Sequence, residues 1–61
     1  MYSTFEKLME EKGVNASQVC KHTGIAKSTI SDWKAGRSTP KVDKMLKLAN
    51  YFGVSIETLI S

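Results

Sequence analysis

The stretch from Asn15 to Gly36 constrains the fold of this chain more than any other part of the sequence. Asn15 is a good N-cap residue, and Gln18 stands three residues later, where its side chain can reach back to the cap amide in a capping box. Gly24 can end this first helix, because glycine takes the left-handed conformation without steric cost. The spacing predicts two short helices joined by a tight turn.

The second of these helices follows the turn directly. Ile25 is expected to be buried just after the turn. Ile30 and Trp33, three residues apart, form the inner stripe of a helix that ends at Gly36. The small side chain of Cys20, on the first helix, lets the two helices cross closely. This spacing is typical of a helix-turn-helix motif.

The outer face of the second helix of the motif is polar. The side chains on this face can donate or accept hydrogen bonds, and none of them is an apolar side chain that would need to be buried. They are Lys27, Ser28, Ser31, Asp32 and Lys34. An exposed helix of this kind has the dimensions to enter the major groove of B-DNA, with its N-terminal residues nearest the base edges.

One helix is predicted before the motif. Ser3 or Thr4 can cap it, and Glu6 lies in its first turn, where a negative charge is favoured. It ends at Lys12, which is followed by Gly13. Its inner stripe consists of Phe5, Leu8 and Met9.

Two helices are predicted after the motif. The first covers residues 42–52 and follows Pro40, with Thr39 as its cap. Its inward-facing residues are expected to be Val42, Met45, Leu46, Ala49 and Phe52. The second is short and is capped by Ser55. The chain is therefore predicted to form one all-α domain of five helices over residues 1–61.

Composition limits the classes of function. Nine Lys and Arg residues against six Asp and Glu give a net charge of +3, and a mildly basic surface attracts nucleic acid. No apolar run approaches the roughly 18 residues of a membrane span, and no basic-then-apolar signal segment opens the chain. We expect a cytoplasmic protein without membrane contact.

Catalysis and metal binding are not expected. One cysteine cannot form an internal disulfide, and one cysteine with one histidine is too few for a structural zinc site. The sequence has no paired-carboxylate site, no nucleophile with a histidine base and no glycine-rich phosphate loop. We expect that the chain is not an enzyme and needs no cofactor.

With Gly36, Pro40 and the tail LKLANYFGVSIETLI, the chain resembles the Cro/C1-type (XRE-like) helix-turn-helix family of bacterial and phage transcription regulators. The resemblance runs from Phe5 to Ile60. It implies a five-helix, lambda-repressor-like DNA-binding domain in which the second and third helices form the motif. It also implies a sequence-specific regulator, more commonly a repressor, that binds a pseudo-palindromic operator in double-stranded DNA as a homodimer.

The resemblance also implies which residues contact bases. The matching positions are Lys27, Ser28, Ser31 and Asp32. Lys27 can donate to guanine O6 and N7, whereas Asp32 can only accept and so favours the cytosine amino group. A second interpretation of Asp32 is a surface charge paired with Lys27, Ser28 or Arg37.

Phosphate contacts are expected on two sides of the recognition helix. The candidates are Asn15, Ser17, Gln18, Thr29, Lys34, Arg37, Ser38 and Lys41. Two features of the sequence, at three positions, depart from the family pattern. Ala26 stands where a hydroxyl or acid usually caps the recognition helix, and Met9 and Lys34 stand where the family often has an arginine–glutamate pair.

The last helix has more apolar surface than a one-sided contact needs. Ile56 and Ile60 either complete the core or form part of a two-fold dimer contact. The alternative function is an antitoxin-like or other protein-interaction module of the same fold, with little or no base readout. Its protein partner would be a toxin or an anti-repressor.

Overall fold

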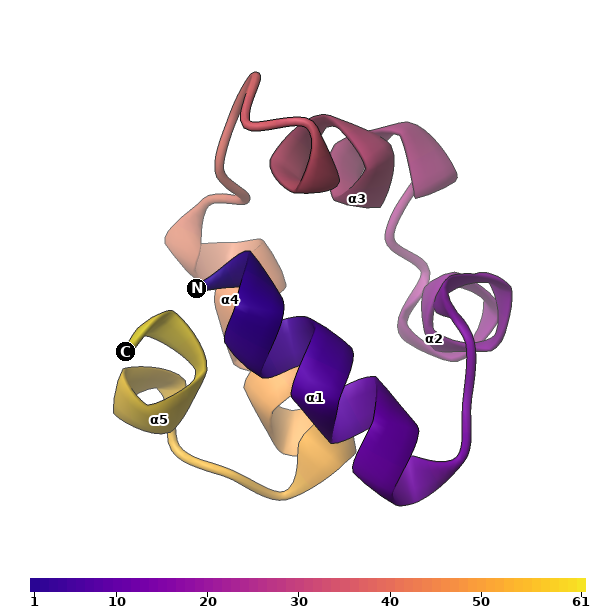
Figure 1. Ribbon diagram of the computed structural model, residues 1–61, viewed down its shortest axis with the longest axis vertical. Coiled ribbons are helices and arrows are strands. Elements are labelled where there is room, and N and C mark those ends of the chain that lie inside the picture. The colour runs from indigo at the N-terminus through magenta and orange to yellow at the C-terminus, as the bar shows by residue number, and fades with distance from the viewer.

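The computed structural model describes all 61 residues, which form five α-helices and no strand. The helices are α1 (Tyr2–Lys12), α2 (Ala16–Thr23), α3 (Lys27–Lys34), α4 (Val42–Phe52) and α5 (Ile56–Ile60) (Figure 1). The two chain ends meet at one edge of the molecule, where the Met1 ammonium group donates to the carbonyl oxygen of Ser61 at 3.2 Å. The predicted all-α fold of five helices is confirmed.

Helix α2 begins and ends with the predicted local structure. The Asn15 side chain accepts from the backbone amide of Gln18, and the Gln18 side chain accepts from the backbone amide of Asn15, both at 2.9 Å. Gly24 takes the left-handed conformation, with φ of 79°, and its amide donates to the carbonyl oxygen of Cys20 at 2.8 Å. The capping box and the glycine stop are confirmed. The following helix, α3, ends at Lys34, and Gly36, just after the C-cap residue Ala35, takes the left-handed conformation with φ of 76°, so the predicted glycine stop at Gly36 is confirmed as well.

The start of α1 differs from the sequence prediction. The helix begins at Tyr2, with Met1 as its N-cap residue and no side-chain cap. Ser3 and Thr4 therefore lie inside the first turn, and no acidic residue lies in that turn, so the predicted place of Glu6 is also wrong. The Thr4 hydroxyl instead donates to the carbonyl oxygen of Ser61 at 3.1 Å. A contact with the distant C-terminus has replaced the local cap.

The start of α4 also differs. Its N-cap residue is Lys41, which makes no side-chain cap, and Thr39 is exposed in the preceding loop. Pro40 is buried ahead of the helix. The predicted cap at Thr39 is therefore wrong.

The buried face of α4 is rotated relative to the prediction. Val42 is 66% exposed and Leu46 is 47% exposed, whereas Leu48, which was not predicted to face inward, is fully buried. Apolar residues cover more than half of the helix circumference, so two overlapping stripes satisfy the helical period. Packing of α4 against both α2 and α5 selects the stripe that contains Leu48.

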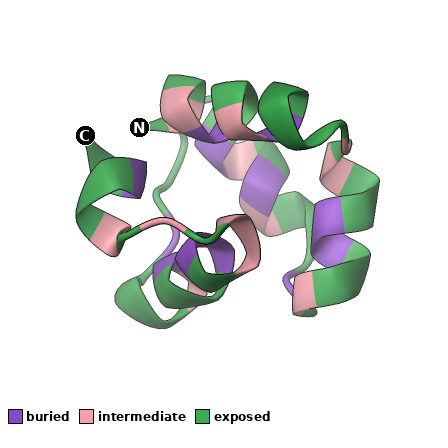
Figure 2. Ribbon diagram, turned by 90° about the horizontal axis from the view of Figure 1, so that it is seen from below, coloured by how far each residue is buried: buried purple, intermediate pink, exposed green.

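All five helices contribute to the hydrophobic core. It consists of Phe5, Met9, Val19, Cys20, Ile25, Ile30, Trp33, Met45, Leu48, Ala49 and Leu59. The buried positions face one another inside the bundle, and the exposed positions line its outside (Figure 2). None of the helices is long and apolar enough to cross a membrane.

Aromatic contacts between α1 and α3 set the position of α3. The Trp33 ring lies 5.2 Å from that of Phe5 and 5.4 Å from that of Tyr2, the second in a T-shaped arrangement. Such pairs contribute about 0.5–1.5 kcal/mol beyond the burial of their area. They attach α3 to the core through one side and leave its other side free.

Candidate nucleic-acid interface

Helix α3 presents a polar face to solvent. Ile30 and Trp33, on its inner side, are 3% and 5% exposed. Ser28 and Ser31, on the outer side, are exposed. A helix turns about 100° per residue, so these two serines share one face roughly opposite the buried pair. Helix α3 is therefore attached through its apolar side and exposes its polar side to solvent, as the sequence predicted.

The beginning of α3 has no side-chain cap. Ala26 is its N-cap residue and has no side-chain acceptor for the first amides. The only first-turn bond outside the helix ladder joins the Thr29 amide to the carbonyl oxygen of Ala26, at 3.1 Å. The amides of Lys27 and Ser28 therefore have no acceptor within the chain, and the positive end of the helix dipole faces outward.

Asp32 is paired with Arg37 on the loop after α3. Nε and Nη2 of Arg37 lie 3.0 Å and 2.9 Å from Oδ1 of Asp32, and the Arg37 amide donates to the Asp32 carbonyl oxygen at 2.9 Å. Both side chains are largely exposed, at 41% and 64%, so the pair contributes little to stability. It does orient the loop against the end of α3. Of the two interpretations of Asp32, this structure contains the pair with Arg37, and a contact with cytosine stays a prediction.

The N-terminus of α2 lies beside α3 and carries unused donors. The capping box occupies the side-chain oxygens of Asn15 and Gln18, which leaves both amide NH2 groups free to donate. The backbone amides of Ala16 and Ser17 have no acceptor within the chain. A helix N-terminus with free amides attracts an anion such as a phosphate group.

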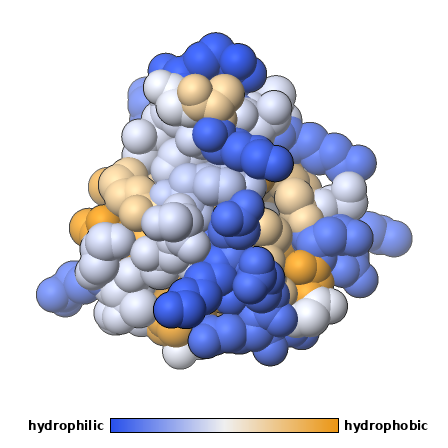
Figure 3. Space-filling model, viewed as in Figure 1, coloured by the Kyte–Doolittle hydropathy of each residue, from blue (hydrophilic) through white to orange (hydrophobic).

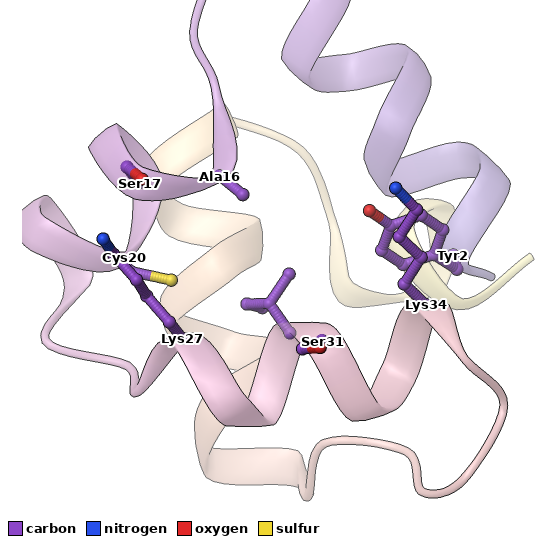
Figure 4. Close-up of a pocket in the computed structure, with 8 residues that line it drawn as sticks. Tyr2, Ala16, Ser17, Cys20, Lys27, Ser31 and Lys34 are labelled. Atoms are coloured by element: carbon purple, nitrogen blue, oxygen red, sulfur yellow. The ribbon is translucent and has the colours of Figure 1, made fainter.

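A cleft of about 220 Å³ lies between α2, α3 and the start of α1, and we call it the α2–α3 cleft. Its lining residues are Tyr2, Ala16, Ser17, Cys20, Lys27, Ile30, Ser31 and Lys34. Lys27 extends from α3 past the thiol of Cys20, and Lys34 extends toward Tyr2 (Figure 4). Both lysines therefore lie along the cleft, on the side of α3 that faces α2.

The remaining predicted contact residues lie outside the cleft. Thr29 is half-buried, whereas Ser38 and Lys41 are exposed in the segment between α3 and α4. The Ser38 amide donates to the carbonyl oxygen of Asp32 at 3.4 Å. Ser38 and Lys41 thus belong with Arg37 to the segment after α3, whereas Thr29 lies in the first turn of α3.

The two side chains that could carry chemistry, those of Cys20 and His22, both make ordinary packing contacts. Burial raises the pKa of the Cys20 thiol, and the ammonium group of Lys27 lowers it by a smaller amount. The thiol therefore stays protonated at neutral pH and behaves as a small core residue. His22 is exposed and packs against Tyr51, with ring centroids 4.8 Å apart and the ring planes tilted by 51°.

Sequence reasoning missed the role of Tyr2 at this interface. Tyr2 is the first residue of α1, and its side chain closes one end of the α2–α3 cleft. Burial, and to a lesser degree the Glu6 carboxylate, raise the pKa of its phenol. No local signal could have revealed this contact, because it depends on how α1 crosses α3.

Comparison with known proteins gives matches over nearly the whole chain. A family model for helix-turn-helix proteins matches residues 5–59. A Vibrio cholerae protein named cryptic phage CTXphi transcriptional repressor RstR is 32% identical over 59 residues, which are 97% of this chain and 53% of that protein. An uncharacterized HTH-type transcriptional regulator of Coxiella burnetii is 37% identical over 59 residues, which are 95% of this chain and 27% of that protein.

A third match covers less of the chain. An uncharacterized HTH-type transcriptional regulator of Haemophilus influenzae is 40% identical over 43 residues, which are 70% of this chain and 18% of that protein. The chain thus spans about half the length of the first relative and less of the other two. No solved structure gives a significant match.

Proposed function

Because this chain belongs to the Cro/C1-type helix-turn-helix family, a family of DNA-binding transcription regulators rather than enzymes, we propose that it binds a pseudo-palindromic operator as a homodimer and represses transcription. The observation that carries the proposal is the exposed polar face of α3, which lies between two groups of phosphate-binding candidates. Such a helix enters the major groove, while the flanking donors hold the DNA backbone. As a DNA-binding regulator, it would act in the cytoplasm of a bacterium.

Base readout would come from four residues of α3. They are Lys27, Ser28, Ser31 and Asp32. Ser28 and Ser31 stand on the outer face, Lys27 can swing out of the cleft to donate to guanine, and Asp32 can exchange Arg37 for a cytosine amino group. The serines can donate or accept, so specificity would depend chiefly on Lys27 and Asp32.

Backbone contacts would come from both flanks of α3. On the α2 side they are Asn15, Ser17, Gln18 and Lys34, and on the loop side they are Arg37, Ser38 and Lys41, with Thr29 at the front of α3 itself. The free amides of Ala16 and Ser17 add a site for one phosphate group. These contacts supply most of the non-specific affinity and make it depend on salt.

The dimer contact would be centred on α5. Ile60 is 44% exposed and Ile56 is half-buried. Apolar atoms reach the surface at the edge where the two chain ends meet (Figure 3). Helix α4, which packs against α5, adds the exposed side chains of Val42 and Leu46. Two copies joined by a two-fold axis would place their recognition helices about 10 base pairs apart on one face of DNA.

Selection from a randomised duplex pool at physiological salt tests the proposal. We expect enrichment of a two-fold symmetric motif, and its half-site should change when Lys27→Gln protein replaces the wild type. The exposed Lys7→Gln substitution on α1 is the matched control and should leave the motif unchanged. Failure to enrich any motif, together with salt-insensitive binding to a protein partner, would instead support the antitoxin-like alternative.

A further inference from the structure

We propose that the α2–α3 cleft also binds a small carboxylic acid that carries an apolar ring, and that this ligand competes with DNA. Competition rests on the proposed function, because it presupposes that α3 docks on DNA. Binding of the acid to the cleft does not depend on it. The assignment follows from the combination of an apolar floor and an unpaired cationic rim.

The floor of the cleft is apolar and held by the core. Tyr2, Ala16, Cys20 and Ile30 provide its hydrophobic lining. Cys20 and Ile30 are only 6% and 3% exposed, and the Tyr2 ring is fixed edge-on against Trp33. An apolar cavity of roughly 150 Å³ holds a benzene molecule. The 220 Å³ of this cleft therefore accommodate a single ring and leave space for a carboxylate at its open side.

The rim of the cleft is cationic. Lys27 and Lys34 stand seven residues apart on α3, about two helical turns, so they lie toward opposite ends of the cleft (Figure 4). The one ion pair of the molecule joins Arg37 and Asp32, so no carboxylate neutralises either lysine. No acidic residue lines the cleft, and the hydroxyl of Ser31 is an additional donor there.

The apolar floor and the cationic rim together favour a ligand that has both an apolar ring and a negative charge. Inorganic phosphate would pair with the lysines but leave the floor uncovered, and a neutral hydrocarbon would cover the floor but leave both charges unpaired. An aromatic carboxylate satisfies both. When bound, it would neutralise Lys27 and Lys34 and fill the space in front of the α2 N-terminus, where the DNA backbone would lie. Such a ligand would release the protein from its operator.

Benzoate is a suitable probe for the site. In a titration of 15N-labelled protein followed by NMR, we expect amide shifts concentrated at the lining residues and a Kd of about 1 mM, as befits a small fragment. Acetate lacks the ring and benzamide lacks the charge, so each should bind about tenfold more weakly. Lys34→Gln should weaken benzoate binding about threefold, whereas Lys47→Gln, on α4 and outside the cleft, should not.

Two results would overturn the site. One is a pattern of shifts spread over surface lysines, with acetate as effective as benzoate. The other is an equal loss of binding in the Lys34→Gln and Lys47→Gln proteins. Either would mean that benzoate responds to general charge rather than to the cleft.

Competition is measured separately, by fluorescence anisotropy of a labelled operator duplex at constant ionic strength. Benzoate at about ten times its Kd should raise the Kd for DNA about tenfold, and acetate at the same concentration should have no effect. Benzoate that fills the cleft without changing DNA affinity would refute competition. If benzoate fills the cleft but no duplex binds at any salt concentration, the proposed regulator function fails and the assignment of the cleft stands.

Discussion

Two leucines on α4 provide a direct test of how the core is built. Leu48 is fully buried, whereas Leu46, two residues earlier, is 47% exposed. Truncation of a buried leucine to alanine costs about 2–5 kcal/mol, because it removes apolar contacts and leaves a cavity. Truncation of a half-exposed leucine costs about 1 kcal/mol or less. Since 61 residues confer a stability of about 3–9 kcal/mol, Leu48→Ala should remove a large share of it.

Urea unfolding followed by Trp33 fluorescence measures both variants. Trp33 is only 5% exposed in the folded protein, so its emission should shift to longer wavelength on unfolding. With a slope of about 1 kcal/mol per molar urea, Leu48→Ala should lower the midpoint by about 2 M or more, and Leu46→Ala by about 1 M or less. The comparison should be made at low protein concentration, where a contact of Leu46 with a second copy contributes least.

An equal cost for the two substitutions, or a larger cost for Leu46→Ala at low concentration, would refute this account of the α4 face. A cost of Leu46→Ala that appears only at high protein concentration would instead support its place in the dimer contact. The two outcomes are separable because only association depends on concentration.

Three further predictions concern the cap, the interface and the buried thiol. Asn15→Ala should destabilise the protein by about 1 kcal/mol in the same urea assay, and an unchanged midpoint would show that the capping box is dispensable. Lys34→Gln should reduce the slope of log K against log salt for DNA binding by about 0.9, whereas Lys47→Gln should leave it unchanged; equal slopes in all three proteins would exclude a phosphate contact by Lys34. Because burial raises the pKa of Cys20 above its ordinary value of 9.0, the unfolded state loses that proton first as the pH rises. Stability should therefore fall as the pH is raised through and above 9.0, and by less in a Cys20→Ala variant; the same fall in both proteins would contradict the assignment.

The features that could be predicted from the sequence are those formed between near neighbours in the chain. The capping box joins Asn15 to Gln18 across three residues, and the left-handed turn at Gly24 needs only the absence of a side chain. The inner stripe of α3 follows from the helical period, because Ile30 and Trp33 are the only large apolar side chains on that helix. Because α3 has only this one apolar stripe, the same face is buried whichever helices pack against it.

The features that could not be predicted depend on which helices meet. On α4 the sequence allows two apolar stripes, and contact with α2 and α5 decided that Leu48 rather than Leu46 enters the core. At the chain ends, Thr4 binds the carbonyl oxygen of Ser61 instead of capping its own helix. The direction of Lys27 and Lys34 along the α2–α3 cleft also required the crossing of the helices.

The sequence by itself therefore determined the five helices, the turn of the motif and the polar face of α3, because local hydrogen bonds and helical periodicity act within a few residues. Only the tertiary structure decided which side of α4 is buried, where Tyr2 lies, and that a cleft opens beside α3. These depend on the packing of side chains far apart in the chain. A periodic pattern specifies that one face of a helix is buried, whereas shape complementarity between helices specifies which other helix packs against that face.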